Sequence, residues 1–265
     1  MNLSPIFAIG TGRCGTHLLE ALLNESKYIS SHHIQDLNLD SFYRYTRWYN
    51  LPVDQSPLLK QRELWIKEAH IKDKIYFESN PYLSFHVDDF HSEFKAKFIF
   101  IYRNPESVIR SHLIKGWYKD IATDNVETYP GLVYGVPINH SLGRIQPLAK
   151  EERREWFSLS QAGKIAWMWS EVNGSIDRQL QAIPADKKFY LRIEELNFEK
   201  LLELEEFVGV SLGLNERKFN KIIEAKPGKG KTLLNRQWSA NEVRDINKFC
   251  SSISLHLGYK NLFIT

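Results

Sequence analysis

The segment at residues 5–23, PIFAIGTGRCGTHLLEALL, constrains the fold of this chain more than any other. It starts with four apolar residues typical of a buried strand, continues through a glycine-rich turn and ends in an apolar stripe with helical spacing. A strand, a turn and a helix in this order direct backbone N–H groups and the positive end of the helix dipole at one point. The sequence therefore predicts a phosphate site where the turn meets the helix.

The residues of this turn differ from those that bind Mg-ATP. A Walker A loop has lysine directly after its second glycine, followed by a serine or threonine that holds magnesium. Gly10 and Gly15 have the Walker spacing. However, Thr16 and His17 follow them, and the basic residue, Arg13, lies inside the loop. The loop is thus suited to hold phosphate but lacks the residues that Mg-ATP chemistry requires. A nucleotide kinase or another P-loop NTPase is therefore an alternative function and not the first expectation.

The composition sets loose limits. A chain of 265 residues with 43% hydrophobic and 25% charged residues is ordinary for a globular protein and long enough to bury a large core. A net charge of +3 gives no argument for nucleic acid as a partner. Two cysteines make no disulfide framework, and no apolar run approaches the length of a membrane span. We therefore expect a cytoplasmic protein with no secretion signal and no membrane-spanning segment.

Apolar runs and helical stripes alternate along the rest of the chain. The patterns predict strands at 6–9, 75–77, 97–102 and 188–193. They also predict a helix that ends near residue 94, a helix that begins at residue 105, and helices at 57–70, 160–183, 199–208, 215–225 and 239–257. Residues 113–154 have no regular pattern and are rich in turn residues. Strands that alternate with helices favour an α/β fold with a parallel sheet covered on both faces. No linker divides the chain, which predicts a single domain over residues 1–265.

A second pattern typical of anion binding follows KFIFIY at 97–102, the clearest buried strand of the sequence. Arg103 comes directly after this strand, and ligands of open α/β sheets bind beyond the carboxyl ends of the strands. Ser111 lies two turns into the next helix, so its hydroxyl can face the same crevice. An arginine fork with a nearby hydroxyl suits a phosphate monoester. The alternative is that Arg103 caps the sheet edge or pairs with a surface carboxylate.

Together these two segments resemble the sulfotransferase family. The sequence GTGRCGTHLL resembles the family's 5′-phosphosulfate loop, and Arg103 and Ser111, eight residues apart, resemble its 3′-phosphate site. Downstream, AWMWSEVNGSI at 166–176, LRIEEL at 191–196, and Trp238 with LGY at 257–259 are similar to later family segments, in the bacterial, tyrosyl-protein or carbohydrate branches. The resemblance covers most of the chain but does not include roughly residues 114–155.

The resemblance implies a P-loop-like three-layer α/β/α sandwich around a parallel sheet. It also implies 3′-phosphoadenosine 5′-phosphosulfate (PAPS) as the donor of a metal-independent transfer. The residues that match the 5′-phosphosulfate loop are Gly12, Arg13, Cys14, Gly15, Thr16 and His17. Among these, Arg13 would stabilise the negative charge that develops during transfer. Lys226, Lys229 and Gly230 resemble the flexible basic segment that folds over the 3′-phosphate, although an ordinary solvated loop is the alternative.

Transfer to a hydroxyl needs a general base. His33 lies twenty residues beyond Arg13, where many sulfotransferases have a glutamate, and histidine has a pKa of about 6.5, close to working pH. His32 and Asp36 are the rival candidates, and the alternative is an exposed histidine pair in a loop. Glu78, in FESNP, is a separate catalytic candidate that would orient acceptor or donor, or it could be a carboxylate at a helix start.

The chain departs from the family pattern at three positions. Cys14 stands where serine is usual, and a thiol at a helix start beside Arg13 could have a lowered pKa, or could simply fill a tight turn. His17 replaces a common threonine and could donate to phosphate. Ile193 replaces the tyrosine of the usual RYEDL pattern, so the resemblance does not carry over an adenosine contact at that position.

The acceptor is less constrained than the donor. The region from Leu113 to Trp156 contains aromatic and imidazole side chains that suit stacking on sugars or phenols, or that pack a long loop: Trp117, Tyr118, Tyr129, Tyr134, His140 and Trp156. Arg153 and Arg154 would tolerate an acidic acceptor. A carbohydrate or other hydroxylated small molecule is the first expectation and a peptide tyrosine the second. A catalytically silent relative that binds a nucleotide or a glycan is a further alternative.

Overall fold

A computed structural model of the chain describes residues 4–119, 126–225 and 237–259. The chain forms two compact units, each made of three separate stretches. The first unit comprises Met1–Asp36, Asp54–Arg103 and Ile176–Lys229, and the second comprises Leu37–Val53, Asn104–Ser175 and Gly230–Thr265. The expectation of one domain over residues 1–265 stays a prediction.

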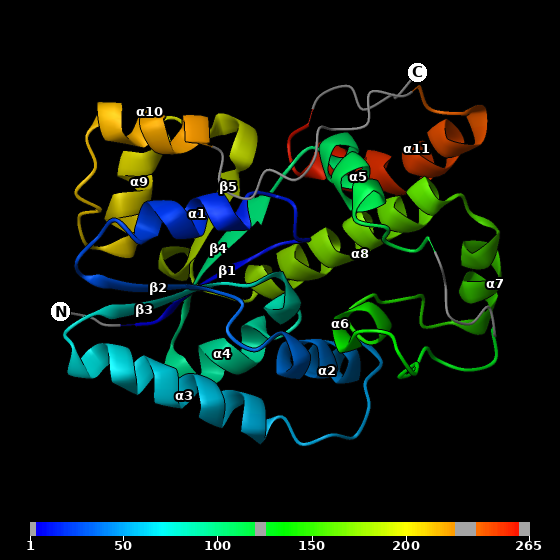
Figure 1. Ribbon diagram of the computed structural model, residues 1–265, viewed down its shortest axis with the longest axis horizontal. Helices are drawn as coiled ribbons and strands as arrows, with labels where there is room; N and C mark the ends of the chain where they lie inside the picture. The colour runs from blue at the N-terminus through cyan, green and yellow to red at the C-terminus, as the bar shows by residue number, and fades with distance from the viewer. Residues whose placement is uncertain (1–3, 120–125, 226–236, 260–265) are drawn as a thin grey trace. The chain divides into compact units, whose positions relative to one another are not determined.

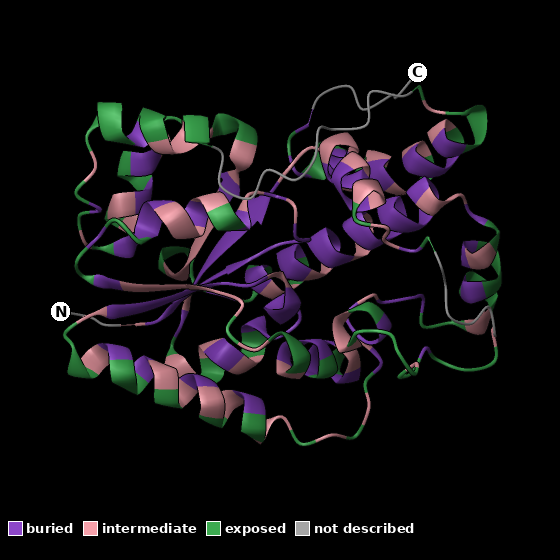
Figure 2. Cartoon of the chain, viewed as in Figure 1, coloured by how far each residue is buried: buried purple, intermediate pink, exposed green. Residues whose placement is uncertain are grey.

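A parallel sheet of five strands forms the centre of the first unit, as the alternating pattern predicted. Its strands are β1 (Ile6–Ile9), β2 (Ile29–His33), β3 (Ile75–Ser79), β4 (Lys97–Tyr102) and β5 (Lys188–Arg192), in the order β2-β3-β1-β4-β5. The side chains of β1, β3 and β4 are almost entirely buried (Figure 2). This explains why their sequences are continuous apolar runs rather than alternating ones.

Helices cover both faces of this sheet (Figure 1). On one face, α1 (Thr16–Leu23), α9 (Phe198–Val208) and α10 (Glu216–Ala225) share an apolar core with the strands. On the other face lie α3 (Ser56–Ile71) and α4 (Val87–Phe94). There the rings of Phe7 and Phe90 approach to 4.6 Å between centroids. The fold is therefore the three-layer α/β/α sandwich that the family resemblance implied.

The second unit is helical. It holds α2 (Leu37–Trp48), α5 (Pro105–Ile114), α6 (Ile138–Ser141), α7 (Lys150–Ser158), α11 (Ala240–His256) and most of α8 (Gln161–Gln181). Helix α6 and the first turn of α7 lie in the stretch 113–154, where no regular structure was expected. Aromatic side chains build its core, with Trp156 edge-on to Tyr118 and to Trp167. These rings therefore pack the irregular region, as one of the two interpretations anticipated.

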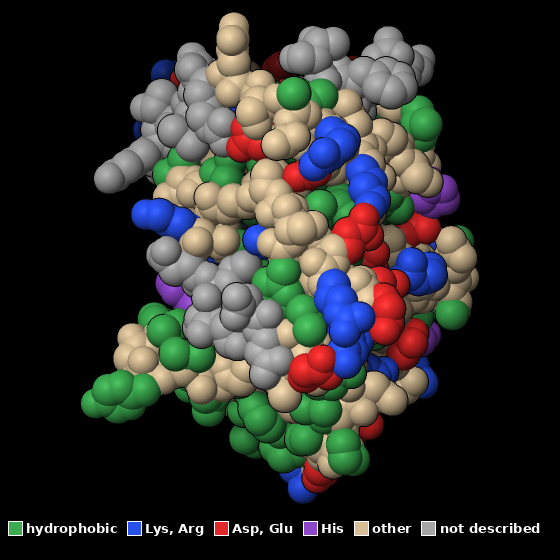
Figure 3. Space-filling model, turned by 90° about the vertical axis from the view of Figure 1, so that its right-hand side faces the viewer, with side chains coloured by type: hydrophobic (Ala, Val, Ile, Leu, Met, Phe, Trp, Pro, Cys, Tyr) green, Lys and Arg blue, Asp and Glu red, His purple; other side chains and the backbone are tan. Residues whose placement is uncertain are grey.

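Charged side chains of both signs mix on the surface drawn in Figure 3. Ion pairs also join opposite charges in the second unit, such as Lys150 with Glu127 and Lys248 with Glu155. Across the described part of the chain, no helix combines the length and the apolar character that a membrane crossing needs.

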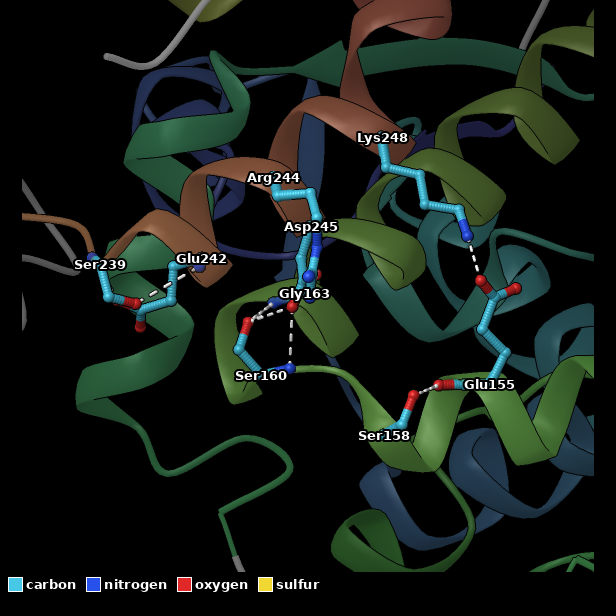
Figure 4. A network of polar contacts seen from close by, with 9 residues as sticks. All are labelled: Glu155, Ser158, Ser160, Gly163, Ser239, Glu242, Arg244, Asp245 and Lys248. Atoms are coloured by element: carbon cyan, nitrogen blue, oxygen red, sulfur yellow. Dashed lines mark hydrogen bonds and ion pairs between the residues drawn. The ribbon is translucent and has the colours of Figure 1, made fainter.

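One polar network joins α11 to the start of α8 (Figure 4). The carboxylate of Asp245 accepts hydrogen bonds from the backbone N–H and the hydroxyl of Ser160, at 2.9 and 2.7 Å. The hydroxyl of Ser160 in turn accepts from the N–H of Gly163 at 3.0 Å. A β-carbon at position 163 would lie 2.6 Å from the β-carbon of Asp245, so the two helices approach closely only because glycine occupies this position.

Gly163→Ala is expected to lower the free energy of unfolding by about 1–3 kcal/mol, the usual cost of overpacking. Helix propensity alone would favour alanine by up to about 1 kcal/mol, so a measured loss reports the clash. Urea denaturation provides the measurement. Gly131→Ala is the matched control, because a β-carbon at position 131 meets no atom within 4 Å. Equal stability of the two variants would contradict the packing argument.

Candidate active site

The turn between β1 and α1 has the conformation of an anion-binding loop. Three of its residues have left-handed backbone, with φ of 75° at Gly12, 57° at Arg13 and 111° at Gly15. Gly15 is required here, because a β-carbon would also lie 2.8 Å from the side chain of Ile193. Helix α1 starts at Thr16 with no side-chain cap and no acidic residue in its first turn. Its N-terminal N–H groups and positive dipole end are thus suited to an anionic ligand.

Two guanidinium groups lie together at this turn. Strand β4 is the neighbour of β1, so Arg103 emerges beside the loop and its Nη1 donates to the carbonyl of Arg13 at 3.3 Å. Burial, followed by the positive charge of Arg103, lowers the pKa of Arg13. Like charges held at one place cost free energy that a bound anion offsets. The pair therefore supports an anion site at the carboxyl ends of β1 and β4.

A stacked imidazole pair lies next to the loop. The rings of His17, on α1, and His33, at the end of β2, are 3.7 Å apart between centroids and tilted by 19°. The Nε2 of His33 is 3.2 Å from the hydroxyl oxygen of Thr16. Burial and then the charge of His17 lower the pKa of His33 to about 4, while burial and Arg13 lower the pKa of His17. Both rings are therefore neutral near pH 7, the state in which a histidine can accept a proton.

The two rival histidines point to opposite faces of the sheet. Successive side chains of a strand alternate between faces. On β2 the hydroxyl of Ser31 donates to the carbonyl of Glu20 in α1, so His33 shares the α1 face. The ring of His32 instead stacks on Tyr76, at 5.3 Å between centroids. Only His33 thus joins the loop residues, and both histidines belong to a strand rather than to an exposed loop.

Glu78 forms a buried ion pair. It lies within β3 rather than at a helix start, and its side chain is 0% exposed. Arg62 donates from Nε and Nη2 to the two carboxylate oxygens, at 3.2 and 3.0 Å. Tyr76 and Asn80 donate one further hydrogen bond each. Burial alone would raise the pKa of Glu78, but the charge and hydrogen bonds of Arg62 hold it below its usual value. This arrangement favours a structural role over proton transfer.

Cys14 is a core residue. Its side chain is 0% exposed and belongs to the apolar cluster between the sheet and α1. Burial raises the pKa of its thiol to about 11, so the thiol stays protonated at neutral pH. The hypothesis of a lowered pKa is therefore wrong, and the alternative of a small residue that fills a tight turn agrees with the packing.

The remaining predicted donor residues lie outside the first unit or outside the described residues. Ser111 is a buried residue of α5 in the second unit. Trp238, also of the second unit, packs on this helix, since its indole N–H donates to Glu106 at 3.0 Å and Arg110 stacks on its ring at 4.2 Å. Lys226, Lys229 and Gly230 lie outside the described residues, and their role stays a prediction.

Sequence reasoning missed the partner of Glu78. Arg62 lies sixteen residues earlier in the chain, in a helix whose pattern shows only an amphipathic surface element. No local motif marks an arginine that will be buried, so only the packing of α3 on β3 reveals the pair.

Comparison with solved structures identifies the fold. The chain matches a sulfotransferase domain from the curacin biosynthetic pathway with a TM-score of 0.57 and 16% identity, over 97% of this chain and 98% of that one. It also matches sulfotransferase STF9 from Mycobacterium avium with a TM-score of 0.57 and 12% identity, over 97% of this chain and 77% of that one. No protein-family model and no curated protein sequence matches the chain. The chain thus has the sulfotransferase fold.

Proposed function

We propose that this chain is an enzyme that transfers a sulfuryl group from PAPS to a hydroxyl acceptor without a metal ion. The observation that carries the proposal is the convergence of Arg13 and Arg103 on a left-handed loop at the open N-terminus of α1. Two cations, a set of backbone donors and a helix dipole fit a donor with two anionic groups, a 5′-phosphosulfate and a 3′-phosphate. The sulfotransferase fold supports the same class of donor.

Each residue of the site has a distinct proposed task. The loop from Gly12 to His17 would hold the 5′-phosphosulfate, and Arg103 with Ser111 would hold the 3′-phosphate. The donor supplies an activated S–O bond, which breaks as a new S–O bond to the acceptor oxygen forms. Arg13 stabilises the negative charge that gathers on the bridging oxygen of the leaving 3′-phosphoadenosine 5′-phosphate. His33 accepts the proton of the acceptor hydroxyl.

The acceptor that we favour is a carbohydrate or another hydroxylated small molecule, with a peptide tyrosine as the second choice. This preference rests on the bacterial-type pattern of the sequence. A cytoplasmic location and the absence of a nucleic-acid partner stay predictions.

Calorimetric titration tests the donor site. We expect 3′-phosphoadenosine 5′-phosphate to bind without magnesium, and more tightly than Mg-ATP. Arg103→Gln is expected to weaken this binding by about 10- to 100-fold, because a hydrogen bond to a charged group contributes about 1.5–3 kcal/mol. Arg217→Gln, an exposed residue of α10, is the control with the same charge change and should bind like the wild type.

The opposite result has a definite meaning. Tight binding of Mg-ATP with no binding of 3′-phosphoadenosine 5′-phosphate would replace the proposal with the kinase or NTPase alternative. Equal affinities of the Arg103 and Arg217 variants would show that Arg103 does not contact the donor.

A further inference from the structure

A pocket of about 380 Å³ lies within the second unit. Three stretches line it, at 115–119, 130–137 and 140–146, all in the region that the sulfotransferase resemblance spares. Its volume is in the range of known small-molecule sites. The loop, histidine and arginine residues of the candidate active site do not line it, so it is a separate feature of the molecule.

The charged residues of this pocket are all basic. Lys115, Lys119 and Arg144 line it, and none of its described lining residues is acidic. Arg144 is held in place, because its Nη1 donates to the carbonyl of Gly116 at 3.2 Å and its guanidinium lies 5.4 Å from the ring centre of Trp117. Basic groups gathered around a concave surface raise the local concentration of anions. The pocket is therefore suited to a negatively charged ligand.

Part of the pocket wall carries no side chains. Glycines at 116, 131 and 135 line it, and a β-carbon added at any of them would meet no atom within 4 Å. Val133 and Tyr118 add apolar surface, and the Tyr118 hydroxyl is fixed by a 2.6 Å hydrogen bond to the carbonyl of Ile145. His140 is a polar group whose pKa is lowered by burial and by Arg144, so its neutral ring can donate to or accept from a hydroxyl.

We propose that this pocket binds a hydroxylated small molecule that carries a carboxylate or sulfate group, such as an acidic sugar. Basic side chains would hold the anionic group, and the open wall of glycines would accommodate the ring.

Direct binding of D-glucuronic acid and of glucose, measured by calorimetry on the full chain, tests the proposal. Glucuronic acid is expected to bind, with an affinity that falls as salt is added, and glucose is expected to bind much more weakly. Lys115→Gln combined with Lys119→Gln should weaken glucuronic acid binding by about tenfold, since exposed ion pairs contribute up to about 1 kcal/mol each. Gly131→Leu, which places a bulky side chain on a residue that lines the pocket, should weaken it by at least tenfold.

Matched controls separate this pocket from overall charge. Lys60→Gln combined with Lys72→Gln removes the same charge from exposed positions of the first unit and should leave binding unchanged. The Lys115, Lys119 and Gly131 variants should all bind 3′-phosphoadenosine 5′-phosphate like the wild type. Loss of that binding instead would identify the pocket as part of the donor site and overturn the proposal.

Other outcomes also decide the matter. Three results would overturn the proposed binding site. These are equal binding of glucose and glucuronic acid, no binding of glucuronic acid at millimolar concentration, and unchanged affinity of the pocket variants. If glucuronic acid binds as expected but 3′-phosphoadenosine 5′-phosphate does not bind, the result supports the proposed binding pocket and contradicts the proposed transfer function.

Discussion

Glu78→Ala is expected to lower the free energy of unfolding by about 3–5 kcal/mol, the largest stability effect that we expect from a single substitution in this chain. The reason is that Arg62 would keep its buried charge without a partner, while Tyr76 and Asn80 would lose their common acceptor. Denaturant unfolding, followed by circular dichroism, measures the loss.

A surface ion pair gives the matched control. Glu63 pairs with Lys67 in the same helix, α3, but both side chains are largely exposed, so Glu63→Ala should cost less than about 1 kcal/mol. Replacing both partners of the buried pair, with Arg62→Met and Glu78→Leu, should cost less than Glu78→Ala alone, because no unpaired charge remains. Equal costs for Glu78→Ala and Glu63→Ala would contradict the structural role of the pair.

The same position also tests the catalytic role predicted for Glu78. Glu78→Gln keeps the shape of the side chain and removes its charge. A variant that is destabilised yet transfers sulfate at a normal rate per folded molecule would support the structural interpretation. A stable but inactive Glu78→Gln variant would instead support the catalytic one.

His33→Ala is expected to reduce kcat for sulfuryl transfer by roughly 10²–10⁴-fold, the usual contribution of a general base. Binding of 3′-phosphoadenosine 5′-phosphate should change little, which separates loss of chemistry from loss of the donor site. His32→Ala is the natural control, because its ring lies on the other face of the sheet against Tyr76 and should leave the rate near that of the wild type.

Two results would contradict this assignment. Full activity of His33→Ala would show that another group takes the proton. If no hydroxylated acceptor from a pool of sugars and phenols is sulfated even by the wild type, although the nucleotide binds, the chain would be a catalytically silent relative. Both experiments measure the transfer of radiolabelled sulfate from the donor to an acceptor.

The pH dependence follows from the surroundings of His33. Burial disfavours its protonated form most, and His17 and Arg13 disfavour it further, whereas Glu78 favours it. The ring must be neutral to act as a base, so activity falls as pH drops through its pKa. For kcat/KM of the donor, which reports the free enzyme, this acid limb is expected near pH 4, because burial and His17 lower the pKa of His33 to about 4. For kcat it should lie at higher pH, because the bound anion raises the same pKa.

Local signals in the sequence located the main elements of the fold. Continuous apolar runs marked β1 and β4, and the glycine-rich turn with Arg13 marked the loop between β1 and α1. The last helix was predicted to begin near residue 239, and in the structure the hydroxyl of Ser239 accepts from the N–H of Glu242 in a full capping box. Each of these features depends on residues close in the chain, so a pattern alone can predict it.

The sequence patterns did not predict strand β2 or helix α2. Strand β2 reads ISSHH, with one apolar residue, because it lies at the sheet edge and is only half buried. Its pairing with β3 makes it a strand, and that contact lies more than forty residues away in the chain. Helix α2, LNLDSFYRYTRW, was missed as well, since its polar residues conceal the face that packs near α6. Tertiary contacts override local propensity at such positions.

By itself, then, the sequence determined the parallel α/β architecture and the residues of the loop between β1 and α1, because burial and backbone geometry restrict which residues can occupy them. Only the tertiary structure decided that His33 rather than His32 lies beside that loop, that Glu78 is held by Arg62, and that the thiol of Cys14 is buried and stays protonated. Those properties depend on which groups meet across the fold, and the free energy of a charge or a proton is set by its neighbours in space.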